Sequence, residues 1–324
     1  MRLTNSLISS NYLKRLNKNL EEFNEVSEKV AAERQFLNVS EDPATAMKAF
    51  QIRKSLQRNS VYSSNLSSAS GLLTEAENTV SIINDVVSQD AIEQISKGIT
   101  GTSDNQAVRK TVADSLRSLQ STILNTANAQ YSGDFIFGGA TSEVKPFTVD
   151  DDGNLLYKGQ NVDTGTFKTE HKYIDVGIGL TVETDGTVSR NSAMDIAFSG
   201  AELLGTGVDS DGITNNVYNL LGDIADKLES GDLDDINKYS QKFNTLAGNV
   251  RLQYVSIGEK SNFITYFNDR LESQKLSDSK RQTELEVLKI DKGSILYSQS
   301  ELAYDACLQM GTKILQPSLL DYID

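Results

Sequence analysis

The sequence is poor in the residues that most often carry chemistry. Its 324 residues include no tryptophan, one cysteine, Cys307, and one histidine, His171. A single cysteine cannot form a disulfide within the chain, and these two residues alone cannot build a zinc site of the usual kind. One histidine also gives no basis for a Ser–His–Asp triad. We therefore expect no catalytic residue, no metal and no cofactor, and we interpret His171 as a solvated strand residue and Cys307 as a small buried hydrophobe.

Other absences narrow the class of protein further. No run of about 18 apolar residues exists, so we expect no membrane insertion. No block rich in Lys and Arg exists, so the electrostatic footprint of a nucleic-acid partner is missing. The N-terminal stretch has no apolar core and is not a Sec signal peptide, which by itself favours the cytoplasm unless a specialised export route operates. Only three prolines occur, at positions 43, 146 and 317, so long stretches are free to be helical.

Acidic residues and glycines gather in the middle of the chain. The net charge is −14, and residues 131–215 hold 14 Asp and Glu against 5 Lys and Arg. The same segment holds 13 of the 22 glycines. The middle of the chain therefore differs chemically from both ends.

Both ends show the 3-4 spacing of apolar residues that is typical of helices packed as coiled coils. The first predicted helix has a seam at Leu13, Leu16, Leu20, Phe23, Val30 and Leu37. The next has the cleanest heptad, at Leu66, Ala69, Leu73, Ala76, Val80, Ile83 and Val87. After a stop near residues 98–104, a helix is predicted over about 105–130, with Val108, Val112, Leu116, Leu119 and Ile123 on one face.

The C-terminal half repeats this pattern. An unbroken ladder runs from Ile236 to Leu271, through Tyr239, Phe243, Leu246, Val250, Gln253, Ile257, Lys260, Ile264 and Phe267. A last helix is predicted to about residue 314, with Leu296, Ala303, Cys307, Met310 and Ile314 on one side. A break divides the first two helices, where Asp42 suits an N-cap and Pro43 a first helical position.

From about residue 131 the apolar spacing changes to two, with turn residues between the segments. We predict hairpins around Asp152-Gly153 and Asp185-Gly186, in type I′ turns, with a strand over 171–183 between them. The run Asp150-Asp151-Asp152-Gly153 is interpreted as a β-turn, because its glycine and its twelfth position do not fit an EF-hand. The run Asp209–Gly212 is interpreted in the same way.

This organisation predicts a mainly α fold with a β-rich insert. The simplest packing brings the N- and C-terminal halves together as a long antiparallel helical coiled-coil rod, with the β part at its side. The terminal helices carry only narrow apolar stripes, so we expect them to become ordered against neighbours.

Several strings resemble the bacterial flagellin superfamily. They are MRLTNSLISSNYLKRLN at the start, FLNVSEDPATA at the break, YSGDFIFGGATSEVKPF after the first helical half and YDACLQMGTKILQPSLLDYI at the end. The resemblance covers about residues 1–150 and 215–324. The Asp42-Pro43-Ala44 string and the SLLDYI ending are most similar to the proteins of that superfamily that join the flagellar hook to the filament.

The resemblance implies a nested, flagellin-like layout. Residues 1–42 with 282–324 would form a terminal coiled-coil core domain, residues 43–135 with 215–281 a helical rod, and residues 136–214 an outer β-rich domain. The break would lie at Asp42 and Pro43. The assembly interface on the terminal helices would comprise Leu13, Leu16, Leu20, Phe23, Val30, Leu296, Leu302, Ala303, Cys307, Met310 and Ile314.

The resemblance also implies partners and a location. The partners would be other hook-associated junction subunits, hook, flagellin, further copies in a ring-like homo-oligomer, and a cytoplasmic export chaperone on the C-terminal helix. The protein would leave the cell by the flagellar type III route, without a cleaved signal, and act at the extracellular hook–filament junction.

Two alternatives to the junction subunit stay open. The first is flagellin itself, the bulk filament subunit, against which the Asp42-Pro43 pair and the C-terminal ending argue. The second is an intracellular coiled-coil adaptor, whose termini would fold stably in the monomer. An enzyme is disfavoured because the residues that its chemistry would use are absent.

Overall fold

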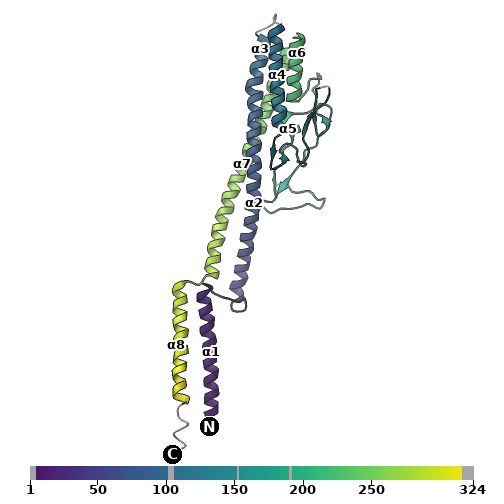
Figure 1. The fold of residues 1–324 in the computed structure, drawn as a ribbon. Helices are drawn as coiled ribbons and strands as arrows, with labels where there is room; N and C mark the ends of the chain where they lie inside the picture. The colour runs from purple at the N-terminus through teal and green to yellow at the C-terminus, as the bar shows by residue number, and fades with distance from the viewer. Residues whose placement is uncertain (1–4, 101–105, 152, 190–191, 316–324) are drawn as a thin grey trace, which may run out of the picture. The chain divides into compact units, whose positions relative to one another are not determined.

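The chain forms two compact units that we describe separately. The computed structural model describes residues 5–100, 106–151, 153–189 and 192–315. Met1–Asn59 and Ser273–Asp324 make up the terminal unit, and Ser60–Glu272 makes up the central unit. The long helices α2 (Pro43–Asp85) and α7 (Ile236–Glu286) contribute to both (Figure 1). The three-domain layout expected from the resemblance stays a prediction.

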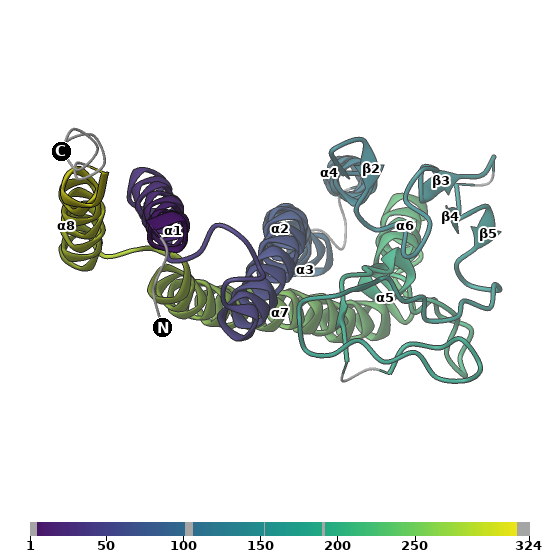
Figure 2. The ribbon, with the colours of Figure 1, turned by 90° about the horizontal axis from the view of Figure 1, so that it is seen from below.

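Helices make up most of the central unit. Helix α2 continues through a π-helical turn, Val86–Ala91, into α3 (Ile92–Thr100). Most of the stop predicted at residues 98–104 lies outside the described residues. Helix α4 (Gln106–Ala127) packs against α3 and α6 (Val217–Ser230). Figure 2 shows α2, α3 and α6 next to α7 from a second direction, with α4 farther from it.

The predicted apolar ladders form the core of the central unit. All seven heptad positions from Leu66 to Val87 are buried. On α7 the ladder from Ile236 to Leu271 is buried or half-buried throughout and joins the same hydrophobic cluster. On α4, however, Val108 is 40% exposed, so its stripe begins one turn later than predicted, at Val112. The mainly α fold with a β-rich insert is confirmed.

The insert consists of short antiparallel strands joined by irregular chain. Strands β1 (Gln130–Tyr131) and β2 (Asp134–Phe135) pair, as do β6 (Tyr173–Ile174) and β7 (Met194–Asp195). A three-stranded sheet has the order β3-β4-β5, in which Phe147 lies opposite Tyr157. These strands are Phe147–Val149, Leu155–Tyr157 and Gln160–Asn161, and the one-turn helix α5 (Gly200–Leu204) follows β7. The strands and α5 gather on one side of the central helices (Figure 1).

The turns of the insert differ in part from the prediction. The reversal at Gly186 exists, with Val182 bridging Val188, but Asp185 has a negative φ, so it is not a type I′ turn. Two-residue loops with positive φ at both positions occur instead at Ser132-Gly133 and Lys158-Gly159. At the other predicted hairpin Gly153 has a positive φ, and Asp152 lies outside the described residues.

The strand predicted over residues 171–183 is wrong for most of its length. Only Tyr173 and Ile174 pair as a strand. Gly177 and Gly179 have φ of 82° and 106°, a backbone conformation that interrupts an extended chain.

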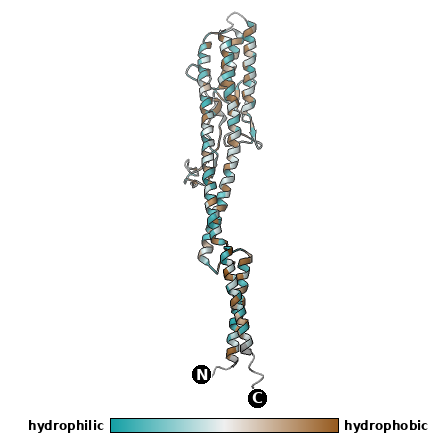
Figure 3. Ribbon diagram, turned by 90° about the vertical axis from the view of Figure 1, so that its left-hand side faces the viewer, coloured by the Kyte–Doolittle hydropathy of each residue, from teal (hydrophilic) through white to brown (hydrophobic). Residues whose placement is uncertain are grey.

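The terminal unit is built on α1 (Asn5–Ala31) and α8 (Ile290–Leu315), which pack side by side. Figures 1 and 3 show the start of α1 beside the end of α8, so the pair is antiparallel. Figure 3 also shows hydrophobic and hydrophilic residues interleaved along both helices, as an amphipathic pair requires.

Candidate assembly surface on the terminal helices

Two glycines of α8 lie against side chains of α1. A Cβ added at Gly311 would collide with the hydroxyl and ring of Tyr12, which is buried on α1. At the other end of the pair, a Cβ at Gly293 would lie 3.4 Å from a methyl group of Val30. The glycines thus make room for side chains from the facing helix.

Aromatic rings fill the middle of the pair. The Phe23 ring lies 5.4 Å from that of Tyr297 and 5.9 Å from that of Tyr304, with which it stacks. The Asn19 side-chain amide donates to the Ala303 carbonyl at 3.1 Å. We call this contact between α1 and α8 the terminal seam.

On α1, the terminal seam lies to one side of the predicted stripe. The more buried positions follow a 4-3-4-3-4 spacing, Tyr12, Leu16, Asn19, Phe23, Val26 and Val30. The predicted Leu16, Phe23 and Val30 are therefore in the seam. Leu13 and Leu20 are exposed, because Tyr12 and Asn19 take the places next to them.

On α8, the difference from the prediction is larger. The more buried positions are Gly293, Tyr297, Ser300, Tyr304, Cys307 and Gly311. Of the predicted residues only Cys307 belongs to them. Leu296, Leu302, Ala303 and Met310 are exposed, and the Ile314 side chain lies outside the described residues. The sequence does carry this pattern, because small and aromatic residues alternate at 3-4 spacing, but the positions of the large aliphatic residues do not indicate it.

The large aliphatic side chains that the seam does not use face outward. Leu302 is 70% exposed and Leu13 is 54% exposed. We call this set the outer apolar residues; it comprises Leu7, Ile8, Leu13, Leu20, Ile290, Ile295, Leu296, Leu302, Leu308 and Met310. Gathered on two helices, so many exposed apolar side chains indicate an interaction surface. Whether another subunit contacts them stays a prediction.

Helix α2 begins at the Asp42-Pro43 pair. The Asp42 carboxylate accepts from the Thr45 amide at 3.0 Å, as an N-cap does. Hydrogen bonds from the Thr45 side chain and amide lower the pKa of Asp42. The break is therefore a capped helix start.

The chain on either side of that break is held to the α7–α8 connection. Gln35 donates its amide to the Glu286 carbonyl at 2.9 Å, and the Leu288 amide donates to the Glu33 carbonyl at 3.0 Å. The Arg53 guanidinium binds both Glu286 oxygens, at 2.6 and 2.7 Å, and lowers the pKa of that carboxyl. Hydrogen bonds and an ion pair thus join the α1–α2 connection to the α7–α8 connection within the terminal unit.

The polar residues His171, Asp150 and Asp209, considered above as candidate sites, each contact other residues of the insert or of the central helices. The His171 Nδ1 lies 2.6 Å from an Asp195 oxygen, and its ring stacks on Tyr173. Asp150 accepts from the Asn154 amide at 2.8 Å, and Asp209 accepts from the Ile213 amide and pairs with a lysine. These carboxylates stabilise turns, as predicted.

The described residues contain neither a metal-binding cluster nor a helix that could span a membrane. No cluster of three or more His, Cys, Asp or Glu residues there could hold a metal ion. Within the same residues, no helix has the length and hydropathy needed to cross a membrane.

The N-terminal part of the chain is similar in sequence to a known protein family. The profile of the bacterial flagellin N-terminal helical region matches residues 4–142. No curated protein sequence matches the chain.

Solved structures share its fold at low sequence identity. A putative flagellar hook-associated protein from Vibrio parahaemolyticus is 17% identical, with a TM-score of 0.61, over 76% of this chain and 100% of that one. The hook-associated protein-3 of Legionella pneumophila is 10% identical, with a TM-score of 0.57, over 72% and 98%. FlgL of Bacillus cereus is 18% identical, with a TM-score of 0.51, over 72% and 99%. This is the fold of flagellar hook-associated proteins.

Proposed function

We propose that this chain is a structural, non-catalytic subunit of the bacterial flagellum that joins the hook to the filament. The observation that carries the proposal is the shared fold with a flagellar hook-associated protein over 76% of this chain and the full length of the other. The match of residues 4–142 to the flagellin N-terminal region supports a flagellar function independently of the fold.

We further propose that the terminal helices are the assembly interface. The outer apolar residues support this. A partner that covers exposed side chains such as Leu302 and Leu13 removes apolar surface from water, which is favourable. Residues 1–42 with 282–324 would form the core layer of the assembly, residues 43–135 with 215–281 the next layer, and residues 136–214 the outer one.

The partners and the route follow from this function. The chain would contact other hook-associated subunits, hook, flagellin and further copies of itself in a ring. A cytoplasmic chaperone would cover α8 before export through the flagellar type III route, since the outer apolar residues would otherwise be exposed in the cell.

Labelling isolated flagella with a gold-tagged antibody against residues 136–214 tests the junction function. We expect one label at the base of each filament. Label along the whole filament would overturn the proposal in favour of flagellin. Signal inside the cell, with none on flagella, would overturn it in favour of an intracellular adaptor.

A substitution that introduces a charge among the outer apolar residues tests the assembly interface. Leu302→Asp should abolish assembly, because burying an unpaired carboxylate is strongly unfavourable, while the central unit stays folded. Gln309→Asp adds the same charge at an exposed polar position of α8 and is the matched control. Normal motility of a strain carrying Leu302→Asp would contradict the role of this surface.

Limited proteolysis of the dilute monomer adds a second readout. We expect cleavage within about residues 1–40 and 285–324 before the central unit is cut, because the terminal pair is stabilised by a narrow seam. Termini that resist digestion as long as the central unit would favour the adaptor.

A further inference from the structure

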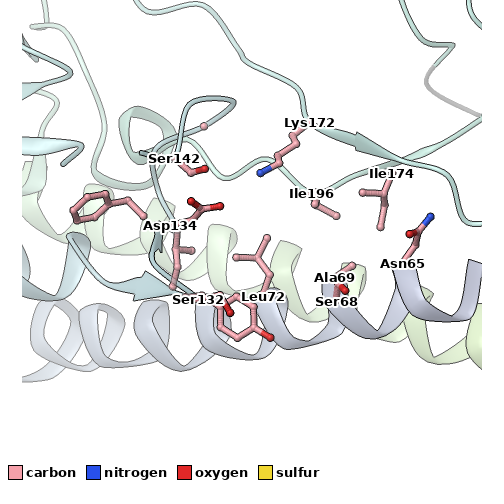
Figure 4. Close-up of a pocket in the computed structure, with 14 residues that line it drawn as sticks. Asn65, Ser68, Ala69, Leu72, Ser132, Asp134, Ser142, Lys172, Ile174 and Ile196 are labelled. Carbon is pink, nitrogen blue, oxygen red and sulfur yellow. The ribbon is translucent and has the colours of Figure 1, made fainter. Parts of the chain in front are cut away.

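A cavity of about 380 Å³ opens in the central unit between α2 and the insert (Figure 4). Its apolar wall comes from helix α2 and from the strands β2, β6 and β7 with their flanking residues. The residues of this wall are Ala69, Leu72, Phe135, Ile136, Ile174 and Ile196. Polar side chains, among them Asn65, Ser68, Ser132 and Ser142, also line the cavity. Its size lies in the range of pockets that bind small molecules.

The walls of the cavity are held in place by contacts of their own. The Tyr131 ring packs so tightly on Gly71 that a Cβ there would collide with its hydroxyl. The Lys172 amide donates to Asp195 at 3.1 Å, and the Lys172 carbonyl accepts from the Ile196 amide at 2.9 Å. A cavity whose walls are already fixed spares a ligand the cost of ordering them.

Two opposite charges face the cavity without an ion pair. Figure 4 shows Lys172 and Asp134 pointing toward the same space, with Leu72 and Ile196 beside it. In the part of the chain that the structure describes, neither charged group has an opposite charge within 4.0 Å. Elsewhere in the insert a lysine does pair closely, as Lys158 does with Glu170 at 2.7 Å.

We propose that this cavity binds a small zwitterion with an apolar side chain, the chemistry of a hydrophobic α-amino acid. The ligand ammonium would lie against Asp134 and its carboxylate against Lys172, so both charges would gain a partner. The apolar side chain would cover Leu72, Ile174 and Ile196. A ligand with one charge would engage only one of the two groups, and a segment inside a peptide chain carries neither terminal charge.

This site is independent of the proposed assembly function, and the full-length monomer is enough to test it. L-Leucine is the probe, in a calorimetric or NMR titration. Three analogues each lack one feature: 4-methylpentanoate has no ammonium, isoamylamine has no carboxylate and glycine has no apolar side chain. We expect L-leucine to bind at least tenfold more tightly than each analogue.

Charge-neutral variants locate the binding. Asp134→Asn and Lys172→Gln should each weaken L-leucine binding at least tenfold. Glu143→Gln and Lys145→Gln remove the same charges from exposed positions in a nearby loop and should leave binding unchanged. All four side chains are exposed, so the variants should fold, which circular dichroism checks.

Three results would overturn the proposal. One is the absence of binding at millimolar L-leucine. A second is equal binding of the analogues. The third is that the Asp134 and Lys172 variants change self-association in sedimentation but not L-leucine binding, which would make the cavity a contact between copies of the chain.

Discussion

The central and terminal units bury different kinds of residue. The central core contains large aliphatic and aromatic side chains such as Leu66, Ile83 and Phe243, all almost fully buried. The terminal seam holds glycine, tyrosine and Cys307, while Leu13 and Leu302 face outward. The central unit therefore buries most of its apolar surface by itself. The terminal unit leaves much of its own exposed, so its stability should depend on a partner.

The largest expected effect tests the self-sufficient core. Phe243→Ala should lower the free energy of unfolding of the central unit by about 3–5 kcal/mol, because removing a fully buried ring leaves a cavity in the core. Leu252→Ala, on the exposed side of the same helix, should change it by less than about 0.5 kcal/mol. Urea denaturation measures both, and equal effects would mean that α7 is not anchored by its ladder.

A pair of glycine substitutions compares the units directly. Gly71→Ala in the central unit and Gly311→Ala in the terminal unit each drive a Cβ into a tyrosine hydroxyl. Each should destabilise its own unit by about 1–3 kcal/mol. We expect Gly71→Ala to lower the urea midpoint, whereas Gly311→Ala should leave that midpoint unchanged and speed proteolysis of the termini.

Two controls sharpen that comparison. Gly248→Ala on α7 meets no atom within 4 Å and should be neutral or slightly stabilising, by about 0.4–1 kcal/mol. Tyr12→Leu combined with Gly311→Ala should cost less than the sum of the single changes, because the collision is shared. Additive costs would show that Tyr12 and Gly311 do not meet.

A smaller effect concerns helix caps. Asn216 is buried at the start of α6 and accepts from the amides of Tyr218 and Asn219, at 3.0 and 3.1 Å. Asn216→Ala should therefore lower the unfolding free energy of the central unit by about 1–2 kcal/mol. Asp42→Ala removes an exposed cap of α2 and should have the weaker effect, visible as faster hydrogen exchange in the first turn after Pro43. A larger effect of Asp42→Ala would reverse this ranking.

The smallest effect is a dependence on pH in the central unit. Burial, with repulsion from Asp163 and Asp226, raises the pKa of Asp223 to about 6. The unfolded carboxyl has a pKa of about 3.9, so the folded state binds this proton more tightly. Stability should rise as pH falls from 7 to 5, and this gain is lost as pH rises through about 6.

Asp223 is an exposed residue although its neighbours desolvate its carboxyl, so solvent screening should keep the gain below about 1 kcal/mol. Asp223→Asn should flatten the slope between pH 5 and 7. A slope that is unchanged in this variant would assign the pH dependence to another group.

The sequence alone determined the features that depend on local order. The ladders from Leu66 to Val87 and from Ile236 to Leu271 predicted the core, because large apolar residues at 3-4 spacing leave a helix only one face to bury. The helix start at Pro43 was also predictable, since capping depends on neighbours in the chain. The high glycine content and the apolar spacing of two predicted where the insert lies, but they did not predict how short its strands are.

Only the tertiary structure decided which faces and turns are used. On α8 the seam takes Tyr297, Tyr304 and two glycines rather than the leucines, because close helix approach needs small residues opposite rings. The spacing of residues alone does not tell which of these two faces of α8, the one with tyrosines and glycines or the one with leucines, packs against α1. Likewise, two-residue turns formed at Ser132-Gly133 and Lys158-Gly159, and not at Asp185-Gly186, because strand pairing sets which residues must have positive φ. The cavity beside Lys172 and Asp134 joins segments far apart in the chain, so no local pattern could have indicated it.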